Sequence, residues 1–518
     1  MKKLLFLTLI GMAVVRAAAA AAPAGRPNII FILADDLGYG DVHGLNPGHG
    51  KIATPCLDHF AAQGMTFTEA HSSSAVCTPS RYSLLTGRYN WRSRLQSGVL
   101  GKYGSTLIPT DRLTVAGMLK QQGYDTACIG KWHLGWQWPQ QGDGYDFSQP
   151  IQGGPTTVGF DYYFGTDVPN YPPYCFIEND HTVGIPATSL PKGLLGHNMA
   201  SVAGPALPGW SLEAILPTIT DKACGFIATR AKAGRPFFLY LPLTSPHTPL
   251  AVSDEWLGRS KLGRYADYVM ETDAMIGRVL QTVEASGVAG NTLVMLASDN
   301  GCAPYIGVAE LEQQGHFPSA DRRGYKSDIW DGGHRIPLLV RWPGRVKAGS
   351  TSSQLVSLAD FMATCAGILD IKIPAGAGED SVSLLPVLLG TADVPVHEAL
   401  VFHSIEGRFA IRQGNWKLEL CPGSGGWGKP VDMAATKQGL PLVQLYDVVV
   451  DVGESNNVQA AHPEVVARLT KLLEKYVADG RSTPGAPQKN DRPVNIWKKP
   501  LNEPRQAGAG KANVPAAD

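Results

Sequence analysis

The stretch NIIFILADDLGYGD, residues 28–41, decides how the fold of this chain is built. Its first part, residues 28–33, is almost entirely apolar, which is typical of a central strand covered on both faces of a sheet. Two acids, Asp35 and Asp36, come directly after this run. Ligands bind beyond the carboxyl ends of strands in open parallel sheets. The stretch therefore predicts both a central strand and a functional edge.

Apolar runs of this kind alternate with helix-like segments along the chain. The further strands predicted are 236–243, 291–298 and the shorter runs 337–342 and 399–404. The predicted helices are 111–122, 212–232 and 264–285. This alternation predicts an α/β fold with a large, mostly parallel sheet flanked by helices.

From about residue 398 the pattern changes. Gly414 and Asn415 occupy the turn of a predicted hairpin over residues 408–421. Another strand is predicted at 441–449 and a periodic helix at 463–478. These elements indicate a small C-terminal α+β subdomain with an antiparallel sheet.

The chain therefore divides into four parts. After about residue 480 it is rich in Pro, Gly, Ala, Asn and Lys, and we expect that segment to pack poorly. The predicted parts are a signal peptide, 1–24; a catalytic domain, 25–397; the α+β subdomain, 398–482; and an irregular tail, 483–518.

The first residues predict export. Lys2 and Lys3 precede an apolar run over 4–15, and the alanines at 17–22 offer small-residue cleavage sites. The run is short for a membrane span, although a retained N-terminal anchor is the alternative. We expect a periplasmic or secreted protein with no membrane span after cleavage.

The charge balance gives no reason to expect a nucleic-acid partner. The chain has 45 basic and 45 acidic side chains. Loss of the signal peptide removes Lys2, Lys3 and Arg16, leaving a small acidic excess. Without a basic field, any anion has to be bound by a local cluster.

Hard metal ligands are predicted at two strand ends. Asp299 and Asn300 follow the strand at 291–298, just as Asp35 and Asp36 follow the first strand. Their side chains supply oxygen donors, which suit Ca²⁺ or Mg²⁺ better than zinc. The alternative is that each pair caps a helix or forms an Asx turn.

Cationic residues follow other predicted strands. They are Lys131 and His133 in IGKWHLG, His247 in LTSPHTP and Lys326 in RRGYKSDIW. Convergence of like charges is costly without an anion, so if they meet, they bind an oxyanion. The alternative for each is an ordinary surface residue.

The sequence alone leaves three roles open for Cys77. It is one of eight cysteines, an even number that permits disulfides without giving their connectivity. Cys77 precedes Pro79 and Arg81 at the expected start of a helix. It is a buried thiol, a disulfide partner or a reactive centre.

The motif CTPSR, residues 77–81, resembles the C-x-P-x-R signature of type I sulfatases, the formylglycine-dependent, arylsulfatase-like enzymes of the alkaline phosphatase superfamily. Further motifs stand in that family's order: DDLGYGD, LLTGRY, GKWHLG, PHTP, SDNG and GGHRIP. The resemblance covers about residues 27–344 and implies an alkaline phosphatase-like core.

This resemblance implies a set of cofactors and site residues. Cys77 is expected to be converted to Cα-formylglycine by a separate formylglycine-generating enzyme that reads Pro79 and Arg81. The implied calcium ligands are Asp35, Asp36, modified Cys77, Asp299 and Asn300. The implied catalytic residues are Cys77, Arg81, Lys131, His133, His247 and Lys326.

The resemblance also implies the chemistry. The hydrated aldehyde at position 77 attacks sulfur and forms a covalent sulfo-enzyme intermediate. His247, with Lys326, protonates the leaving oxygen, and His133 takes the proton of the second hydroxyl as sulfate departs. Disulfide pairing of Cys77 would prevent this chemistry.

We expect an O-sulfated carbohydrate substrate, specifically 6-O-sulfated galactose or N-acetylgalactosamine. The alternatives are a phosphonate or phosphodiester hydrolase of the same superfamily and a catalytically silent binding protein. Asp331 stands where many relatives carry Glu and is left unassigned. Loops 167–184 and 315–324 match no general motif, and we expect them to shape substrate subsites, with ordinary loop packing as the alternative.

Overall fold

The computed structural model describes residues 25–193 and 202–498, so the predicted signal peptide lies outside the described residues. Within these ranges the main sheet has ten strands, in the order β15-β2-β14-β13-β1-β12-β4-β7-β8-β9. The strands are β1 (Asn28–Asp35), β2 (Met65–Phe67), β4 (Asp125–Ile129), β7 (Tyr162–Gly165), β8 (Ile177–Glu178), β9 (His181–Thr182), β12 (Phe237–Pro246), β13 (Thr292–Ser298), β14 (Leu338–Arg341) and β15 (Ser350–Ser352). The predicted first strand is thus a central one.

The middle of this sheet is parallel. Strands β13, β1, β12, β4 and β7 all run in one direction, whereas β14, β2, β8 and β9 complete the edges through antiparallel pairings. The predicted α/β fold with a large, mostly parallel sheet is confirmed. Because the parallel strands end at one edge, the residues after them meet there.

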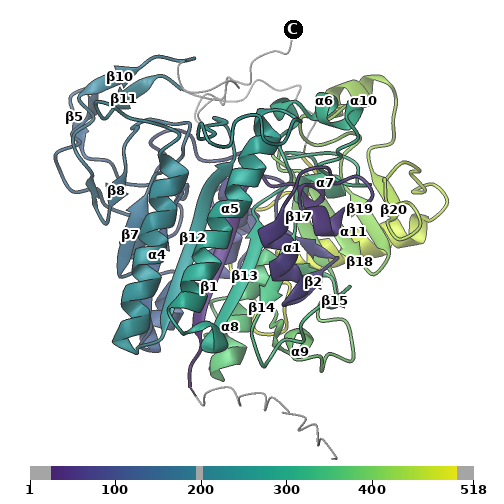
Figure 1. Cartoon of the computed structure of the whole chain (residues 1–518). Coiled ribbons are helices and arrows are strands. Elements are labelled where there is room, and N and C mark those ends of the chain that lie inside the picture. Colours follow the sequence, from purple (N-terminus) through teal and green to yellow (C-terminus); the bar gives the residue numbers. More distant parts are fainter. Residues whose placement is uncertain (1–24, 194–201, 499–518) are drawn as a thin grey trace, which may run out of the picture.

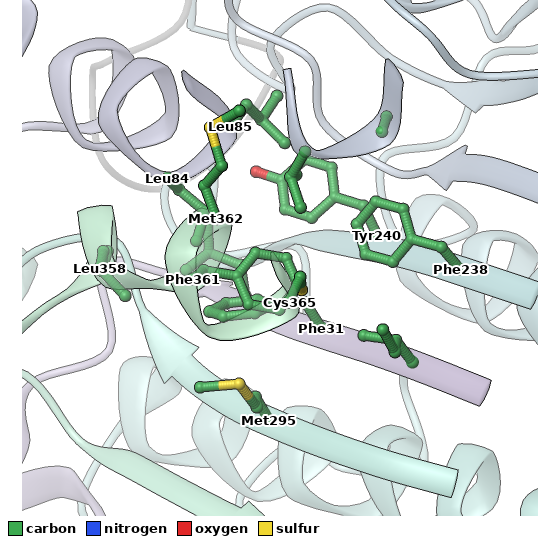
Figure 2. Close-up of a cluster of buried hydrophobic side chains, with 14 of the residues drawn as sticks. Phe31, Leu84, Leu85, Phe238, Tyr240, Met295, Leu358, Phe361, Met362 and Cys365 are labelled. Atoms are coloured by element: carbon green, nitrogen blue, oxygen red, sulfur yellow. The ribbon is translucent and has the colours of Figure 1, made fainter. Parts of the chain in front are cut away.

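The side chains of β1 explain why its sequence is apolar without interruption. Phe31 and its alternate neighbours pack into one apolar cluster, and Ile30, Ile32 and Ala34 pack into another on the opposite face. Figure 2 shows the first cluster, where Phe31 meets Phe361 of α8 (Phe361–Leu369). On the other face, α4 (Ile215–Ala233) and α5 (Arg264–Ala285) lie side by side over the sheet (Figure 1).

The predicted helices are present, with differences at their starts. Helix α5 has the expected bounds, whereas α4 begins three residues later than predicted. Helix α3 (Val115–Gln121) begins at 115 rather than 111, because Oγ1 of Thr114 accepts a hydrogen bond from Gly117 N and caps it there. The other α-helices of this part are α1 (Pro55–Ala62), α2 (Cys77–Thr86), α6 (Val308–Gln313), α7 (Asp331–His334) and α9 (Leu385–Leu388).

The C-terminal subdomain has the predicted antiparallel sheet, at the right of Figure 1. Its strands are β17 (Leu400–His403), β18 (Phe409–Gln413), β19 (Trp416–Glu419) and β20 (Gln444–Asp447). Its helices are α10 (Asp432–Lys437) and α11 (Pro463–Ala478). The hairpin turn at Gly414 and Asn415 lies where it was predicted.

Short pairs of strands complete the described chain. They are β3 (Ala70–His71) with β16 (Val356–Ser357), β5 (Gln140–Gln141) with β6 (Gly144–Tyr145), and β10 (Thr188–Leu190) with β11 (Gly204–Ala206). Among the described residues, no helix has the length and apolar character needed to cross a membrane.

The expectation that the chain packs poorly after residue 480 is wrong for the described residues 481–498. That segment has no helix or strand, yet Nη2 of Arg88 lies 3.0 Å from Oδ1 of Asp491. Nη1 of Arg92 donates to Oδ1 of Asn490 at 3.1 Å, and Ile496 is buried in the C-terminal cluster. Buried arginines therefore hold the segment in place. The composition of residues 481–498 gave no sign of these contacts.

Candidate active site

The tip of β1 supplies the two acids at the centre of the site. Asp35 ends the strand, and Asp36 turns the chain with a φ of 64°, in the left-handed region. Both carboxylates are buried. The backbone N–H of Asp36 donates to Oδ1 of Asp299 at 3.1 Å, which links this turn to the end of β13.

The parallel register places Asp299 and Asn300 beside these acids. Ala34 of β1 pairs with Ser298 of β13, so the residues that follow each strand leave the sheet together. Nδ2 of Asn300 donates to Oδ1 of Asp36 at 2.8 Å, and Oδ1 of Asn300 is buried without a hydrogen-bond partner in the described part of the chain. Four oxygen-bearing side chains from two strands thus share one buried position.

Four cationic or ionisable groups surround the acids. Lys131, after β4, lies 2.8 Å from Oδ2 of Asp35, and Nζ of Lys326 lies 2.7 Å from Oδ2 of Asp36. Nε2 of His247, directly after β12, lies 3.7 Å from the same oxygen of Asp36. The fourth is Arg81, which contacts Asp299 and Asp35 as described next. We call the three basic side chains Arg81, Lys131 and Lys326 the cationic ring.

Arg81 and Cys77 come from α2. Cys77 is its first residue and Pro79 falls in its first turn, where a helix needs no N–H donor. Arg81 lies four positions after Cys77, so both side chains lie on one face of the helix. Arg81 binds Asp299 with Nε at 3.0 Å and Nη2 at 2.6 Å, and its Nη2 lies 3.2 Å from Asp35. Cys77 is within Coulombic reach of Asp299.

Cys77 itself is buried and free. Its exposed fraction is 3%. All eight cysteines lie in the described part of the chain, and none of them forms a disulfide there. The disulfide alternative for Cys77 is therefore not what this structure shows.

The donor set fits a hard cation. Asp35, Asp36, Asp299 and Asn300 offer only oxygen atoms for it, and the buried, unpartnered Oδ1 of Asn300 is a polar atom that a cation would satisfy. The carboxylates of Asp35 and Asp36 lie close enough together, with His247, to bind one ion. A calcium ion is consistent with these residues.

Burial and charge together set the protonation of the acids. Burial raises the pKa of Asp35, but Lys131 and the neighbouring cations outweigh it and hold the pKa well below its usual range. Burial raises the pKa of Asp299 above its usual range even though Arg81 opposes the shift. A bound cation would favour the ionised carboxylate of Asp299.

The histidines are neutral at neutral pH. Burial and the charge of Lys131 lower the pKa of His133 to about 3. Burial and the charge of Lys326 lower the pKa of His247 to about 4. Nδ1 of His247 donates to the carbonyl of Thr248, which leaves its Nε2 facing Asp36.

The two ring nitrogens of His133 have different surroundings. Its Nε2 lies 2.9 Å from the carbonyl of Leu100, which can only accept, so Nε2 carries the proton. Nδ1 is buried and has no partner among the described residues. Oδ1 of Asp167 accepts from the backbone N–H of His133 at 3.3 Å and fixes its left-handed turn.

Sequence reasoning missed Leu100, which contributes only its carbonyl from a loop without a motif. It pointed to the loop of Asp167 but gave that residue no role. In the same loop Tyr171 lies edge-on to His133, with ring centroids 6.3 Å apart. The aromatic content of the loop was the available signal.

The second unassigned loop behaves differently. His316 in loop 315–324 is completely buried, and its Nε2 lies 2.8 Å from Oδ1 of Asp41. This supports ordinary loop packing for His316. Asp331 is also structural, because its Oδ1 lies 2.9 Å from Nζ of Lys417 in the C-terminal subdomain.

Comparisons with known proteins agree on one family. The family model described as Sulfatase matches residues 27–371. An N-acetylgalactosamine-6-O-sulfatase of Bacteroides thetaiotaomicron is 35% identical over 87% of this chain and 93% of its own. Bovine arylsulfatase A is 34% identical over 94% of this chain and 96% of its own.

A solved structure supports the same relationship. It comes from work on the metabolism of multiple glycosaminoglycans by Bacteroides thetaiotaomicron. It matches with a TM-score of 0.77 and 33% identity, covering 87% of this chain and 99% of the other.

Proposed function

The chain belongs to the sulfatase family and is a sulfuric ester hydrolase, and on that premise we propose that it removes 6-O-sulfate from galactose or N-acetylgalactosamine units of a carbohydrate. The named activity of the Bacteroides relative supports the sugar and the position. The cationic ring supports an anionic ester as the substrate.

One observation carries this proposal. Arg81, Lys131 and Lys326 converge on a single buried cluster of acids beside Cys77. In this structure the carboxylates of Asp35, Asp36 and Asp299 offset these charges, and a cation bound by those acids would leave a net positive charge that favours an anion there. A sulfate ester brings three oxygens that such cations can bind.

Two groups complete the proposed site. Calcium bound by Asp35, Asp36, Asp299 and Asn300, with the modified side chain of residue 77, would supply positive charge next to the sulfate oxygens. Formylglycine at position 77 would supply the attacking hydroxyl of its hydrate. We propose that a formylglycine-generating enzyme makes this conversion.

The chain's own residues then have distinct tasks. Lys131 and Lys326 bind the sulfate oxygens and offset its charge. Arg81 holds Asp299 in place through its paired hydrogen bonds. His133 accepts a proton at Nδ1, the nitrogen that its contact with Leu100 leaves free.

His247 is proposed to protonate the leaving alcohol through Nε2. Burial and the charge of Lys326 keep it neutral in the resting protein. An adjacent sulfate ester anion favours the protonated imidazole, because opposite charges stabilise each other in a buried site. Lys326 is a second donor within the same cluster.

The burial of Cys77 places a limit on its maturation. The thiol is 3% exposed and begins a regular helix. A second enzyme cannot reach it in the folded protein, so conversion has to precede folding. This fits the proposed export route, in which the chain meets the maturation enzyme before it leaves the cell.

A desulfation screen tests the proposal. Protein whose position 77 is shown by mass spectrometry to have exchanged its thiol sulfur for an aldehyde oxygen is offered defined sulfated monosaccharides. We expect release of sulfate from 6-O-sulfated N-acetylgalactosamine or galactose. Faster cleavage of matched phosphate or phosphonate esters would favour the phosphonate hydrolase alternative. No turnover of any ester by converted protein would favour a silent binding protein.

A further inference from the structure

Two aromatic side chains stand together beside the cationic ring. Tyr305 belongs to the short helix η6 (Pro304–Ile306), and Trp427 belongs to a loop of the C-terminal subdomain. Their ring centroids are 5.8 Å apart and their planes are tilted by 49°. Tyr305 is 41% exposed and Trp427 is half-buried. Within the described residues, neither ring belongs to an apolar core cluster.

Backbone contacts fix both rings to the loop that carries Lys326. The N–H of Lys326 donates to the carbonyl of Cys302 at 2.8 Å, three residues before Tyr305. The N–H of Trp427 donates to Oγ of Ser327 at 2.9 Å. Tyr305 is also within Coulombic reach of Lys326 and Cys77. Each ring is therefore carried by a segment that is hydrogen-bonded to the loop of Lys326.

The loop that carries Trp427 packs closely against Ser327 and Asp328. It reads GSGGWG over residues 423–428, so Trp427 is its one large side chain. A Cβ on Gly426 would lie 2.4 Å from the carbonyl oxygen of Ser327, and one on Gly428 would lie 2.4 Å from Oδ2 of Asp328. At Gly426 glycine is needed for the backbone to come this near, and at Gly428 a side chain would have to displace the carboxylate of Asp328.

We propose that Tyr305 and Trp427 form one wall of the subsite for the sugar ring that carries the sulfate. This inference rests on the proposed function. A pyranose ring has an apolar C–H face, which packs well against an exposed aromatic face. Tyr and Trp provide rigid contact area at a small conformational entropy cost. The C-terminal subdomain then contributes directly to substrate recognition.

Kinetics of two variants, Trp427→Ala and Tyr305→Ala, test the wall. The substrate is 6-O-sulfated N-acetylgalactosamine, and inorganic sulfate is the competing probe because it fills the sulfate position without a ring. We expect KM to rise about tenfold in each variant, the factor that corresponds to one lost aromatic contact. We expect kcat and the inhibition constant of inorganic sulfate to stay at wild-type values.

Trp416→Ala is the matched control. Trp416 is a partly buried tryptophan of the same subdomain whose ring contacts His462, with centroids 4.8 Å apart and planes tilted by 50°. Its variant should keep the wild-type KM. If Trp427→Ala fails to fold, Trp427→Phe and Tyr305→Ala test the wall in its place. We expect Trp427→Phe to retain most of the affinity for the sugar.

Two results would overturn the wall and leave the proposed function intact. An unchanged KM in Tyr305→Ala and Trp427→Ala would show that the rings do not contact the sugar. A parallel rise in the inhibition constant of inorganic sulfate would show damage to the sulfate position instead. Wild-type enzyme that cleaves aryl sulfates but no sulfated saccharide would refute the proposed function, and the wall with it.

Discussion

Nη2 of Arg81 lies 2.6 Å from Oδ2 of Asp299, and both side chains are fully buried. This ion pair fastens α2 to the end of β13. Since Cys77 and Arg81 share one face of α2, the same pair orients the residue at position 77 toward the oxygen donors. The pair therefore links the proposed nucleophile to the proposed metal ligands.

Cys77→Ala should abolish sulfate release while the protein still folds. The change removes the proposed nucleophile and deletes one small buried atom. We expect a loss of at least about 10⁴-fold in kcat/KM, the scale seen when a covalent nucleophile is removed. Sulfate release and the midpoint of urea unfolding are the measurements. Cys224→Ala, at a half-buried cysteine in α4, is the control and should keep activity. Wild-type activity in Cys77→Ala would end the covalent mechanism.

Calcium should stabilise the folded protein as well as activate it. A ligand that binds only the native state stabilises it by about 2.7 kcal/mol at 100 times its Kd. We expect chelated protein to lose activity and its thermal unfolding midpoint to fall, with both restored by added Ca²⁺. Asn300→Ala should weaken the calcium dependence of that midpoint. Full activity after exhaustive removal of metal would refute the proposed ligands.

His247→Ala should affect esters according to their leaving groups. A protonated imidazole helps most when the departing alcohol is a poor leaving group, as a sugar hydroxyl is. We expect roughly 10²-fold or greater loss in kcat for a sulfated sugar and a smaller loss for an activated aryl sulfate. Steady-state rates on the two substrates provide the comparison. Equal losses would count against a proton-donor role.

Stability should fall in mild acid, in part because of His403. Burial lowers the pKa of His403 to about 3, whereas an unfolded histidine titrates near 6.5. Between these values the unfolded chain binds the extra proton, so this contribution is present above pH 6.5 and is lost as the pH falls. From pH 7.5 to pH 5 the loss is about 2 kcal/mol. Urea unfolding should show a correspondingly smaller loss in His403→Gln. An identical pH dependence in the two proteins would contradict this assignment.

Lys417→Met should destabilise the protein strongly. Nζ of Lys417 lies 2.9 Å from Asp331, 3.1 Å from Glu419 and 2.6 Å from Glu454, all buried. Removing one partner leaves buried acids without compensation, which costs about 3–5 kcal/mol. The free energy of unfolding measures the effect. Lys475→Met is the control, because Lys475 pairs with Asp479 on the exposed surface. A loss near that of the control would show that the buried acids are protonated and need no partner.

The sequence predicted what depends on local pattern. The apolar run at residues 28–33 predicts a strand that is covered on both faces of the sheet. The acids that follow this strand therefore lie at the carboxyl edge of the sheet. The structure places the side chains that follow β1 and β13 together, and their roles stay predictions. The carbonyl of Leu100 and the ring of Trp427 could not be predicted. Each arrives from a loop whose position is set by contacts between distant segments, and neither lies on a periodic element.

Helix starts show the same limit on a smaller scale. Apolar spacing alone favoured residue 111 as the start of α3, but one hydroxyl, that of Thr114, sets the start at 115. The packing of residues 481–498 was missed because the signal lies elsewhere, in the buried guanidinium groups of Arg88 and Arg92.

Those two arginines also bear on when position 77 becomes inaccessible. They follow α2 almost directly, yet Arg88 pairs with Asp491, 403 residues further along the chain. At about 5–20 residues per second, a ribosome needs roughly 20–80 s to make that distance. Until that point Arg88, just after α2, lacks its contact with Asp491. Because the segment that contacts Arg88 is made near the end of synthesis, the packing beside α2 would be completed late. During that time Cys77 in the nascent chain would still be open to modification.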